Sequence, residues 1–186
     1  KSLKMVMKNL NYLRETVKKF LDLSRIEKGE LKITKTKLRL KEDVFDPSLD
    51  IFSGRIAEKQ IKVINNIAPE IKVEGDIDLL RISANNLVGN AVKYGLDKGK
   101  VVLGSEDLDR KVQIEIYNDS RPIQEHEKKK LFKKFSRLGT LKEKKVKGTG
   151  LGLYITRQVI ENHGGTIWVE TRSGGNSFIF QIERGL

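Results

Sequence analysis

The segment KGTGLGLYITRQVIENHGG carries three glycines at alternate positions, Gly148, Gly150 and Gly152, just before and within the first turn of an expected amphipathic helix. Because glycine has no side chain, backbone N–H groups here can approach an anion, and the positive end of the helix dipole favours that anion further. The alternative is a glycine-rich loop that only turns the chain. The segment is not a Walker A loop, which requires GK[ST], and no strand directly precedes it as a dinucleotide fingerprint requires.

A second group of polar residues lies in DLLRISANNLVGNAVKYG, where Asn86 and Asn90 are four residues apart and Lys93 follows. This spacing places both amides and the lysine on one face of a helix. An Asn carbonyl oxygen is a suitable ligand for a Mg²⁺ ion that bridges phosphates, since Mg²⁺ takes few protein ligands. Taken alone, an Asn pair on a helix face is more often exposed to solvent or capping a helix.

Alternating strands and amphipathic helices would position these groups. Asp76 is a suitable N-cap for the helix that carries the two asparagines. Strands are expected at 31–40, 60–67 and 70–75 and in two hairpins, 100–108 with 110–118 and 165–171 with 176–183; helices are expected at 43–57, 76–94, 123–132 and 149–162, with a long loop at 133–147. The pattern predicts an α+β fold, a two-layer α/β sandwich with a mixed, mostly antiparallel sheet and helices on one face.

The first thirty residues predict one long helix. Apolar residues separated alternately by three and four positions form a narrow heptad seam, made of Leu3, Val6, Leu10, Leu13, Val17 and Phe20. The helix is expected to end near Lys28-Gly29. One helix cannot bury such a seam alone, so a partner helix is expected from another chain or from a part absent here.

Composition narrows the functional classes. The 186 residues include no Cys, which excludes disulfides and thiolate metal sites, and the net charge is +12. Nucleic-acid binding is the weaker interpretation of that charge, because the lysines gather near the start and at 128–147 with no aromatic stacking platform. No run approaches the roughly 18 apolar residues of a membrane span. The first residue is Lys1, so a longer protein is expected, with any membrane segment upstream.

Together the motifs resemble the catalytic and ATP-binding domain of bacterial sensor histidine kinases, within the GHKL superfamily that includes gyrase B subunits and MutL proteins. NNLVGNAVKY resembles the N box, LFKKFSRLG the F box, and KGTGLGLYITRQVIENHGG the second glycine box. IWVETRSGGNSFIFQIE resembles the closing hairpin, and LDLSRIEKGEL the end of the second helix of the dimerisation and phosphoacceptor hairpin. The resemblance covers about Leu31 to Glu183 and implies a Bergerat-type fold.

The resemblance also implies a division of the chain. Residues 1–29 would be the second helix of that hairpin, and residues 30–186 the catalytic domain with a mobile lid at about 133–147. The family phosphorylates a His on the first hairpin helix, but His126 and His163 are the only histidines here and neither lies in such a motif. The acceptor helix is therefore expected to be absent, which explains the unpartnered seam. His163 ends the family's helix and is expected to be structural.

Three residues would carry the chemistry by this resemblance. Asn90 would bind Mg²⁺, Lys93 would reach the phosphates, and Arg137 would meet the γ-phosphate from the lid. Asn86 would lie beside Asn90, toward the phosphates, and Tyr94 would pack near the base or ribose.

The glycine box would line the phosphate tail through its glycines and two further amides: Gly148, Gly150 and Gly152, with the amides of Leu151 and Leu153. Ser177 falls where the family usually has a Thr near the adenine end.

The segment VQIEIYNDSRPI departs from the family's first glycine box, D-x-G-x-G-I. When Ile123 is matched to the isoleucine, Asn118 replaces the Asp, and Ser120 and Pro122 replace the glycines. An Asn carbonyl can accept the hydrogen bond from the adenine amino group, and its NH₂ can donate to a ring nitrogen. Asp119 would be the adenine partner only if the strand end slipped by one residue, so we expect Asn118.

The implied function is binding of ATP with Mg²⁺ and transfer of the γ-phosphate to a histidine on a helix outside this chain, for relay to a response-regulator aspartate. ADP would bind at the same site, and the full-length protein would form a homodimer through the helical hairpin. A cytoplasmic location is expected, with membrane attachment only through segments absent here and no nucleic-acid partner. The alternative is a degenerate nucleotide-binding domain that acts as a scaffold.

Overall fold

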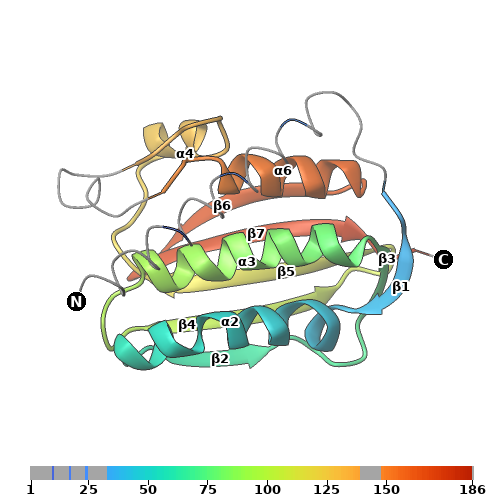
Figure 1. The fold of residues 1–186 in the computed structure, drawn as a ribbon, viewed down its shortest axis with the longest axis horizontal. Coiled ribbons are helices and arrows are strands. Elements are labelled where there is room, and N and C mark those ends of the chain that lie inside the picture. Colours follow the sequence, from blue (N-terminus) through green and yellow to red (C-terminus); the bar gives the residue numbers. More distant parts are fainter. Residues whose placement is uncertain (1–9, 11–16, 18–23, 25–32, 139–147, 186) are drawn as a thin grey trace.

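The computed structural model describes residues 33–138 and 148–185, together with Leu10, Val17 and Ser24 (Figure 1). In chain order the elements are β1 (Thr36–Arg39), the π-helix η1 (Leu40–Phe45), α2 (Asp46–Glu58), β2 (Lys62–Asn66), β3 (Lys72–Gly75), α3 (Ile77–Tyr94), β4 (Lys100–Asp107), β5 (Lys111–Asp119), α4 (Glu125–Leu131), α6 (Gly152–Asn162), β6 (Thr166–Arg172) and β7 (Gly175–Glu183).

Five strands form the main sheet in the order β2-β4-β5-β7-β6, and β1 pairs with β3 in a separate two-stranded sheet. β2 and β4 are parallel, and the other pairs of the main sheet are antiparallel. The antiparallel pairs β4–β5 and β6–β7 are the two expected hairpins. The predicted mixed, mostly antiparallel sheet is therefore confirmed.

Helices α2, α3 and α6 lie across the same face of this sheet (Figure 1). The strands bury alternate residues beneath them: Val112, Ile114 and Ile116 of β5 are fully buried, while the residues between them are less so. Phe180 of β7 stacks on Phe45 with ring centroids 6.5 Å apart. The predicted two-layer arrangement is confirmed, since one face of the sheet packs on helices through a single apolar layer.

Helix α3 begins at the predicted cap. The carboxylate of Asp76 accepts hydrogen bonds from the N–H groups of Asp78 and Leu79, both at 3.1 Å. Its own N–H donates to Nε2 of His163 at 3.0 Å, and Nδ1 of that ring lies 2.7 Å from the carbonyl of Val159. Burial lowers the pKa of His163, which keeps the ring neutral and able to accept at Nε2. His163 thus ties the end of α6 to the start of α3, as a structural residue does.

Helix α3 ends beside a lysine from the preceding helix. Nζ of Lys59 donates to the carbonyl of Val92 at 3.2 Å and to that of Gly95, and it lies 3.4 Å from Asp97. A cation at a helix C-terminus satisfies carbonyls that have no partner within the helix. The last turn of α3, which carries Lys93 and Tyr94 of the expected ligand-binding residues, is therefore held at its end.

Some boundaries differ from expectation. β1 is shorter than the predicted strand because Leu40 begins the π-helix. α4 begins at Glu125, after a capping box in which Gln124 and Glu127 satisfy each other's backbone N–H groups. α6 begins at Gly152 rather than Thr149.

Two predictions lie largely outside the described residues. These are the central part of the expected lid, 139–147, and the expected heptad helix apart from three of its positions. Leu10, Val17 and Ser24 are helical, and the side chains of Leu10 and Val17 are 55% and 50% exposed. Among the described residues no helix is long and apolar enough to cross a membrane.

Candidate functional site

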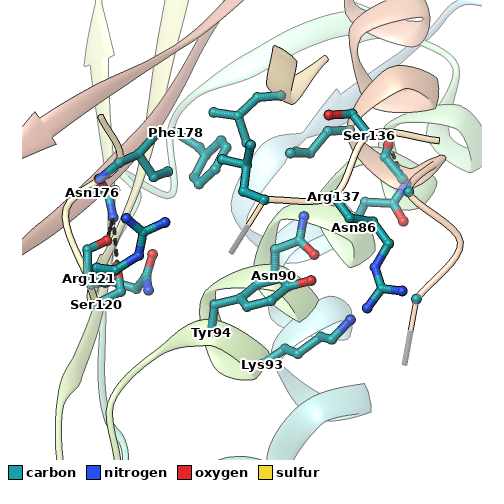
Figure 2. Close-up of a pocket in the computed structure, with 18 of the residues that line it drawn as sticks. Asn86, Asn90, Lys93, Tyr94, Ser120, Arg121, Ser136, Arg137, Asn176 and Phe178 are labelled. Carbon is teal, nitrogen blue, oxygen red and sulfur yellow. Dashed lines mark hydrogen bonds between the residues drawn. The ribbon is translucent and has the colours of Figure 1, made fainter. Parts of the chain in front are cut away.

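A cavity opens between the last turns of α3, the end of β5, the segments on either side of α4, the start of α6 and the start of β7 (Figure 2). It brings together motifs that are far apart in the sequence. Of the predicted site residues, most line it: Asn86, Asn90, Lys93, Tyr94, Asn118, Ile123, Arg137, Gly148, Gly150, Gly152 and Leu153. Its two ends differ in chemistry.

One end is cationic. Lys93 and Arg137 both line it, and the pKa of Lys93 is lowered by burial first and then by the nearby charges of Arg137 and Arg55. The positive charges that lower the pKa of Lys93 are compensated when an anion enters. A side chain at Gly148 would lie 2.9 Å from Nζ of Lys93, so the glycine lets the ammonium group lie against the backbone.

The glycine segment closes against the start of the expected lid. Gly150 has a φ of +74°, and a Cβ there would lie 2.6 Å from the backbone carbon of Phe135. Both the conformation and the close approach therefore require glycine. α6 starts at this point, and no side chain caps its first N–H groups. Because its first residues, Gly152 and Leu153, line the cavity, these N–H groups can bind an anion there. This arrangement suits a polyphosphate.

Asn86 and Asn90 differ in their contacts. Nδ2 of Asn86 donates to the carbonyl of Gly152 at 3.2 Å, so the side chain holds the start of α6 while lining the cavity. Asn90 lies one turn further on, and no hydrogen bond joins its carboxamide to any residue in the described part of the chain. Its oxygen is available as a ligand.

The donor chemistry fits Mg²⁺ better than a transition metal. Within the described ranges, no group of three His, Cys, Asp or Glu residues could hold a metal ion. Mg²⁺ commonly uses one or two protein oxygens and completes its shell with phosphate oxygens and water. Asn90, close to the cationic end, supplies such an oxygen.

Leu151 is placed differently from its neighbours. Its side chain is 2% exposed and packs with Ile155 and Val159 in a small apolar cluster between α6 and α3. Its N–H lies 3.4 Å from Oγ1 of Thr149, and it does not line the cavity. Leu153 therefore lines the cavity beside the glycines, whereas Leu151 does not.

We call the opposite end the apolar end, because Ile123, Leu131 and Phe178 lie on its walls; Ser120, Arg121 and Asn176 add polar groups there (Figure 2). Asn118 lies there and is 3% exposed. Asp119 is directed away, since its carboxylate accepts hydrogen bonds from the N–H of Lys100 at 2.8 Å and the hydroxyl of Tyr117 at 2.6 Å. The bond to Asp119 raises the pKa of Tyr117 to about 12. The strand register thus presents Asn118, as expected, although its contact with a nucleotide stays a prediction.

Ser177 does not reach the cavity. It pairs with Tyr117 across the sheet, and both side chains lie on the face opposite the helices. Its neighbours Asn176 and Phe178 line the cavity instead. Successive residues of a strand face opposite sides of the sheet, so a family position assigned one residue too far along the strand points to the wrong face.

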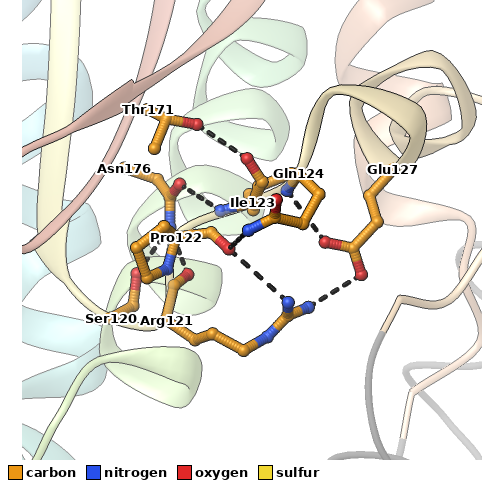
Figure 3. A network of polar contacts seen from close by, with 8 residues as sticks. All are labelled: Ser120, Arg121, Pro122, Ile123, Gln124, Glu127, Thr171 and Asn176. Carbon is orange, nitrogen blue, oxygen red and sulfur yellow. Dashed lines mark hydrogen bonds and ion pairs between the residues drawn. The ribbon is translucent and has the colours of Figure 1, made fainter.

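Asn176 is the main residue that sequence reasoning missed. Its Oδ1 accepts from the N–H of Ile123 at 2.8 Å, while Nδ2 donates to Oγ of Ser120 and to the carbonyl of Arg121, both at 2.8 Å (Figure 3). The side chain thus holds the segment that replaces the family's glycines. The alternation of β7 was the available signal, because Phe178 and Phe180 are core residues on the same face.

Other lining residues were not predicted either. Arg121, Ser136 and Thr149 add polar groups to the cavity, and Leu138 adds an apolar one. Tyr94 is 42% exposed, and Nζ of Lys93 lies 4.8 Å from the centroid of its ring.

Comparison with known proteins agrees with this geometry. Residues 75–185 match the model of the histidine kinase-, DNA gyrase B-, and HSP90-like ATPase family. The sensor histidine kinase CusS of Escherichia coli is 28% identical over 180 residues, which cover 96% of this chain and 37% of CusS. The chain thus spans little more than a third of that relative.

Solved structures of histidine kinases are similar as well. The catalytic domain of the histidine kinase ThkA superposes with a TM-score of 0.73 and 34% identity, covering 82% of this chain and 97% of that domain. ThkA in complex with the response regulator protein TrrA gives a TM-score of 0.74 and 30% identity, covering 97% of this chain and 49% of ThkA. The chain therefore belongs to the histidine kinase-, DNA gyrase B-, and HSP90-like ATPases, and within them to the catalytic domains of histidine kinases.

Proposed function

We propose that this domain binds ATP with Mg²⁺ and transfers the γ-phosphate to a histidine on a dimerisation helix outside the chain, for relay to the aspartate of a response regulator. The observation that carries the proposal is that one cavity has both a cationic, glycine-lined end and an apolar end where the buried residue Asn118 lies. A nucleoside triphosphate has the same division between polyphosphate and base.

The residues at the cationic end would orient the triphosphate. Lys93 and the first N–H groups of α6 would bind its oxygens, and Asn90 would hold the Mg²⁺ through its amide oxygen. Bound Mg²⁺ would neutralise part of the negative charge of the triphosphate. Arg137, on the segment that enters the expected lid, would stabilise charge on the γ-phosphoryl group as it moves to the acceptor nitrogen, with ADP as the leaving group.

The lysines of the expected lid, residues 133–147, would favour its closure over the triphosphate. Closure would exclude water from the reacting phosphate, which favours transfer to histidine over hydrolysis.

Two described positions of the expected heptad helix support the expected partners. Leu10 and Val17 are seven residues apart, helical and about half exposed, as expected for seam positions that await a second helix. We infer a homodimer of the longer protein through this helix, located in the cytoplasm where ATP is available. A response regulator is the proposed partner because ThkA, a relative of this domain, is found in complex with one.

Phosphate transfer to a separately supplied hairpin tests the proposal. The chain is incubated with radiolabelled ATP, Mg²⁺ and helical hairpins from several histidine kinases, and acid-labile label on the hairpin is measured. We expect labelling that is lost in Asn90→Ala and retained in Asn162→Ala, since Asn162 is exposed at the far end of α6. Absence of labelling on every hairpin, by a chain that binds Mg-ADP, would argue for a nucleotide-binding scaffold.

A further inference from the structure

The apolar end of the cavity contains three buried polar side chains, Asn118, Ser120 and Asn176. Two of them are engaged within the protein. Asn176 makes three hydrogen bonds to the segment after β5, and the hydroxyl of Ser120 accepts one of these. Asn118 differs, because no hydrogen bond joins its carboxamide to any residue in 33–138 or 148–185, although the residue as a whole is only 3% exposed. Since Asn118 lines the cavity, its carboxamide is open to a ligand bound there.

The segment beside Asn118 has little freedom to adapt. Besides the bonds from Asn176, Oγ1 of Thr171 donates to the carbonyl of Ile123 at 2.7 Å, and the N–H of Gln124 donates to Glu127 at 2.9 Å (Figure 3). The N–H of Ser120 donates to the carbonyl of Gly174 at 3.2 Å. Asn118 therefore presents its carboxamide to a ligand from a fixed frame.

The chemistry of that group differs from that of a carboxylate. A carboxamide offers one acceptor and two donors, and its terminal torsion has a broad, roughly two-fold profile, so rotation can exchange the positions of oxygen and nitrogen. Adenine presents an amino donor beside a ring-nitrogen acceptor. A 6-oxopurine presents a carbonyl acceptor beside a ring N–H donor. Asn118 can satisfy either pattern, whereas an ionised carboxylate can only accept.

No acidic side chain at the cavity supplies the preference for adenine that a carboxylate would give. Among the residues described, none that lines the cavity is Asp or Glu. Asp119 is directed to the opposite face of the sheet, where the N–H of Lys100 and the hydroxyl of Tyr117 bind it.

We propose that the unpartnered carboxamide of Asn118 makes this a site for 6-oxopurine nucleotides as well as adenine nucleotides. The proposal rests on the proposed nucleotide-binding function, which it extends to a broader class of phosphate donor.

The test compares three ligands by isothermal titration calorimetry in the presence of Mg²⁺. Inosine diphosphate differs from ADP at the purine 6-position and the adjacent ring nitrogen, and pyrophosphate lacks both the ribose and the base. We expect inosine diphosphate to bind within about fivefold of ADP, and both to bind at least about tenfold more tightly than pyrophosphate, because only the nucleotides can contact Asn118 and the apolar walls. Inosine diphosphate no tighter than pyrophosphate, with tight ADP, would overturn the proposal. Absence of ADP binding would instead overturn the proposed function.

A matched pair of variants tests the residue. At pH 8, Asn118→Asp should weaken inosine diphosphate relative to ADP by about tenfold or more, because the introduced carboxylate has no donor for the 6-oxo group. Asp119→Asn, the reverse change at the next position, should leave that ratio unchanged. Equal ratios in the wild type and in Asn118→Asp would contradict the assignment.

Circular dichroism melts check that both variants fold. If Asn118→Asp is unfolded, Asn118→Ala decides: it should bring ADP and inosine diphosphate close to the affinity of pyrophosphate. A variant that keeps the wild-type preference of both nucleotides over pyrophosphate would overturn the role of Asn118.

Discussion

Replacing Asn176 by alanine removes three hydrogen bonds at once, one of them buried and two partly buried. The lost partners are the N–H of Ile123, the hydroxyl of Ser120 and the carbonyl of Arg121, each at 2.8 Å from the Asn176 amide. At about 1 kcal/mol of net stability for each bond, the free energy of unfolding should fall by about 3 kcal/mol. The residual bonds from Thr171 and Glu127 hold part of the segment, so the fold should persist.

The segment that Asn176 holds forms the apolar end of the cavity, while the cationic end is built on α3 and the start of α6. If the ligand must order this segment on binding, at a cost of about half of the lost free energy, the affinity for Mg-ADP falls by about tenfold. The affinity for Mg-pyrophosphate should change by less than about twofold. Calorimetric titrations with both ligands, together with urea unfolding, measure these quantities.

The control is Asn162→Ala, which removes one exposed hydrogen bond, to the carbonyl of Gln158 at 2.8 Å. It should change neither affinity. Two results would refute the reasoning for Asn176: a loss of stability of the expected size with unchanged ADP affinity, or an equal loss for ADP and pyrophosphate. The first would make Asn176 purely structural, and the second would mean that the two ends of the cavity are not independent.

Further predictions concern the cationic end and the buried histidine. Gly150→Ala should weaken the binding of Mg-ADP by about tenfold and destabilise the fold by about 1–2 kcal/mol, because Gly150 has a φ of +74° and an added Cβ would lie 2.6 Å from the backbone of Phe135. Gly54→Ala is the control and should not weaken binding, since an added Cβ there meets no heavy atom within 4 Å. Equal affinities of the two variants in titrations would contradict this prediction. Lys93→Met should weaken the binding of Mg-ADP by about tenfold and reduce the salt dependence of its dissociation constant. Titrations at several salt concentrations measure this dependence. If the variant and the wild type depend equally on salt, Lys93 does not contact the phosphates. The pKa of His163 in the folded state lies below the ordinary value of 6.5, so the stability that the neutral ring contributes is complete above pH 6.5 and is lost as the pH falls from there toward the lowered pKa. The urea midpoints at pH 8 and pH 5 should therefore differ more in the wild type than in His163→Gln. Equal differences in the two proteins would refute this prediction.

The main elements could be predicted because their signals are local. Asp76 was identified as the N-cap of α3 from its type and position, and the structure shows both expected backbone hydrogen bonds. The two hairpins of the main sheet follow from alternating apolar residues and intervening turn residues. The glycines before α6 were identified from their spacing, and Gly150 has the positive φ that such a segment requires.

Three features could not be predicted, two because they depend on long-range geometry and one because it has no local sequence signal. The amide of Asn86 contacts Gly152, which lies 66 residues away in the sequence. The π-helix η1 has no distinctive residue pattern. Ser177 was assigned by matching a family position, whereas the side of the sheet that it faces is decided by the pairing register with Tyr117.

Titration with Mg-ADP tests the central claim most directly, that the cavity binds a nucleotide through Asn90 and Mg²⁺. We expect micromolar affinity that falls sharply when Mg²⁺ is removed or in Asn90→Ala, and that is unchanged in Asn162→Ala. No binding at millimolar nucleotide, or equal binding with and without Mg²⁺ and Asn90, would contradict the account.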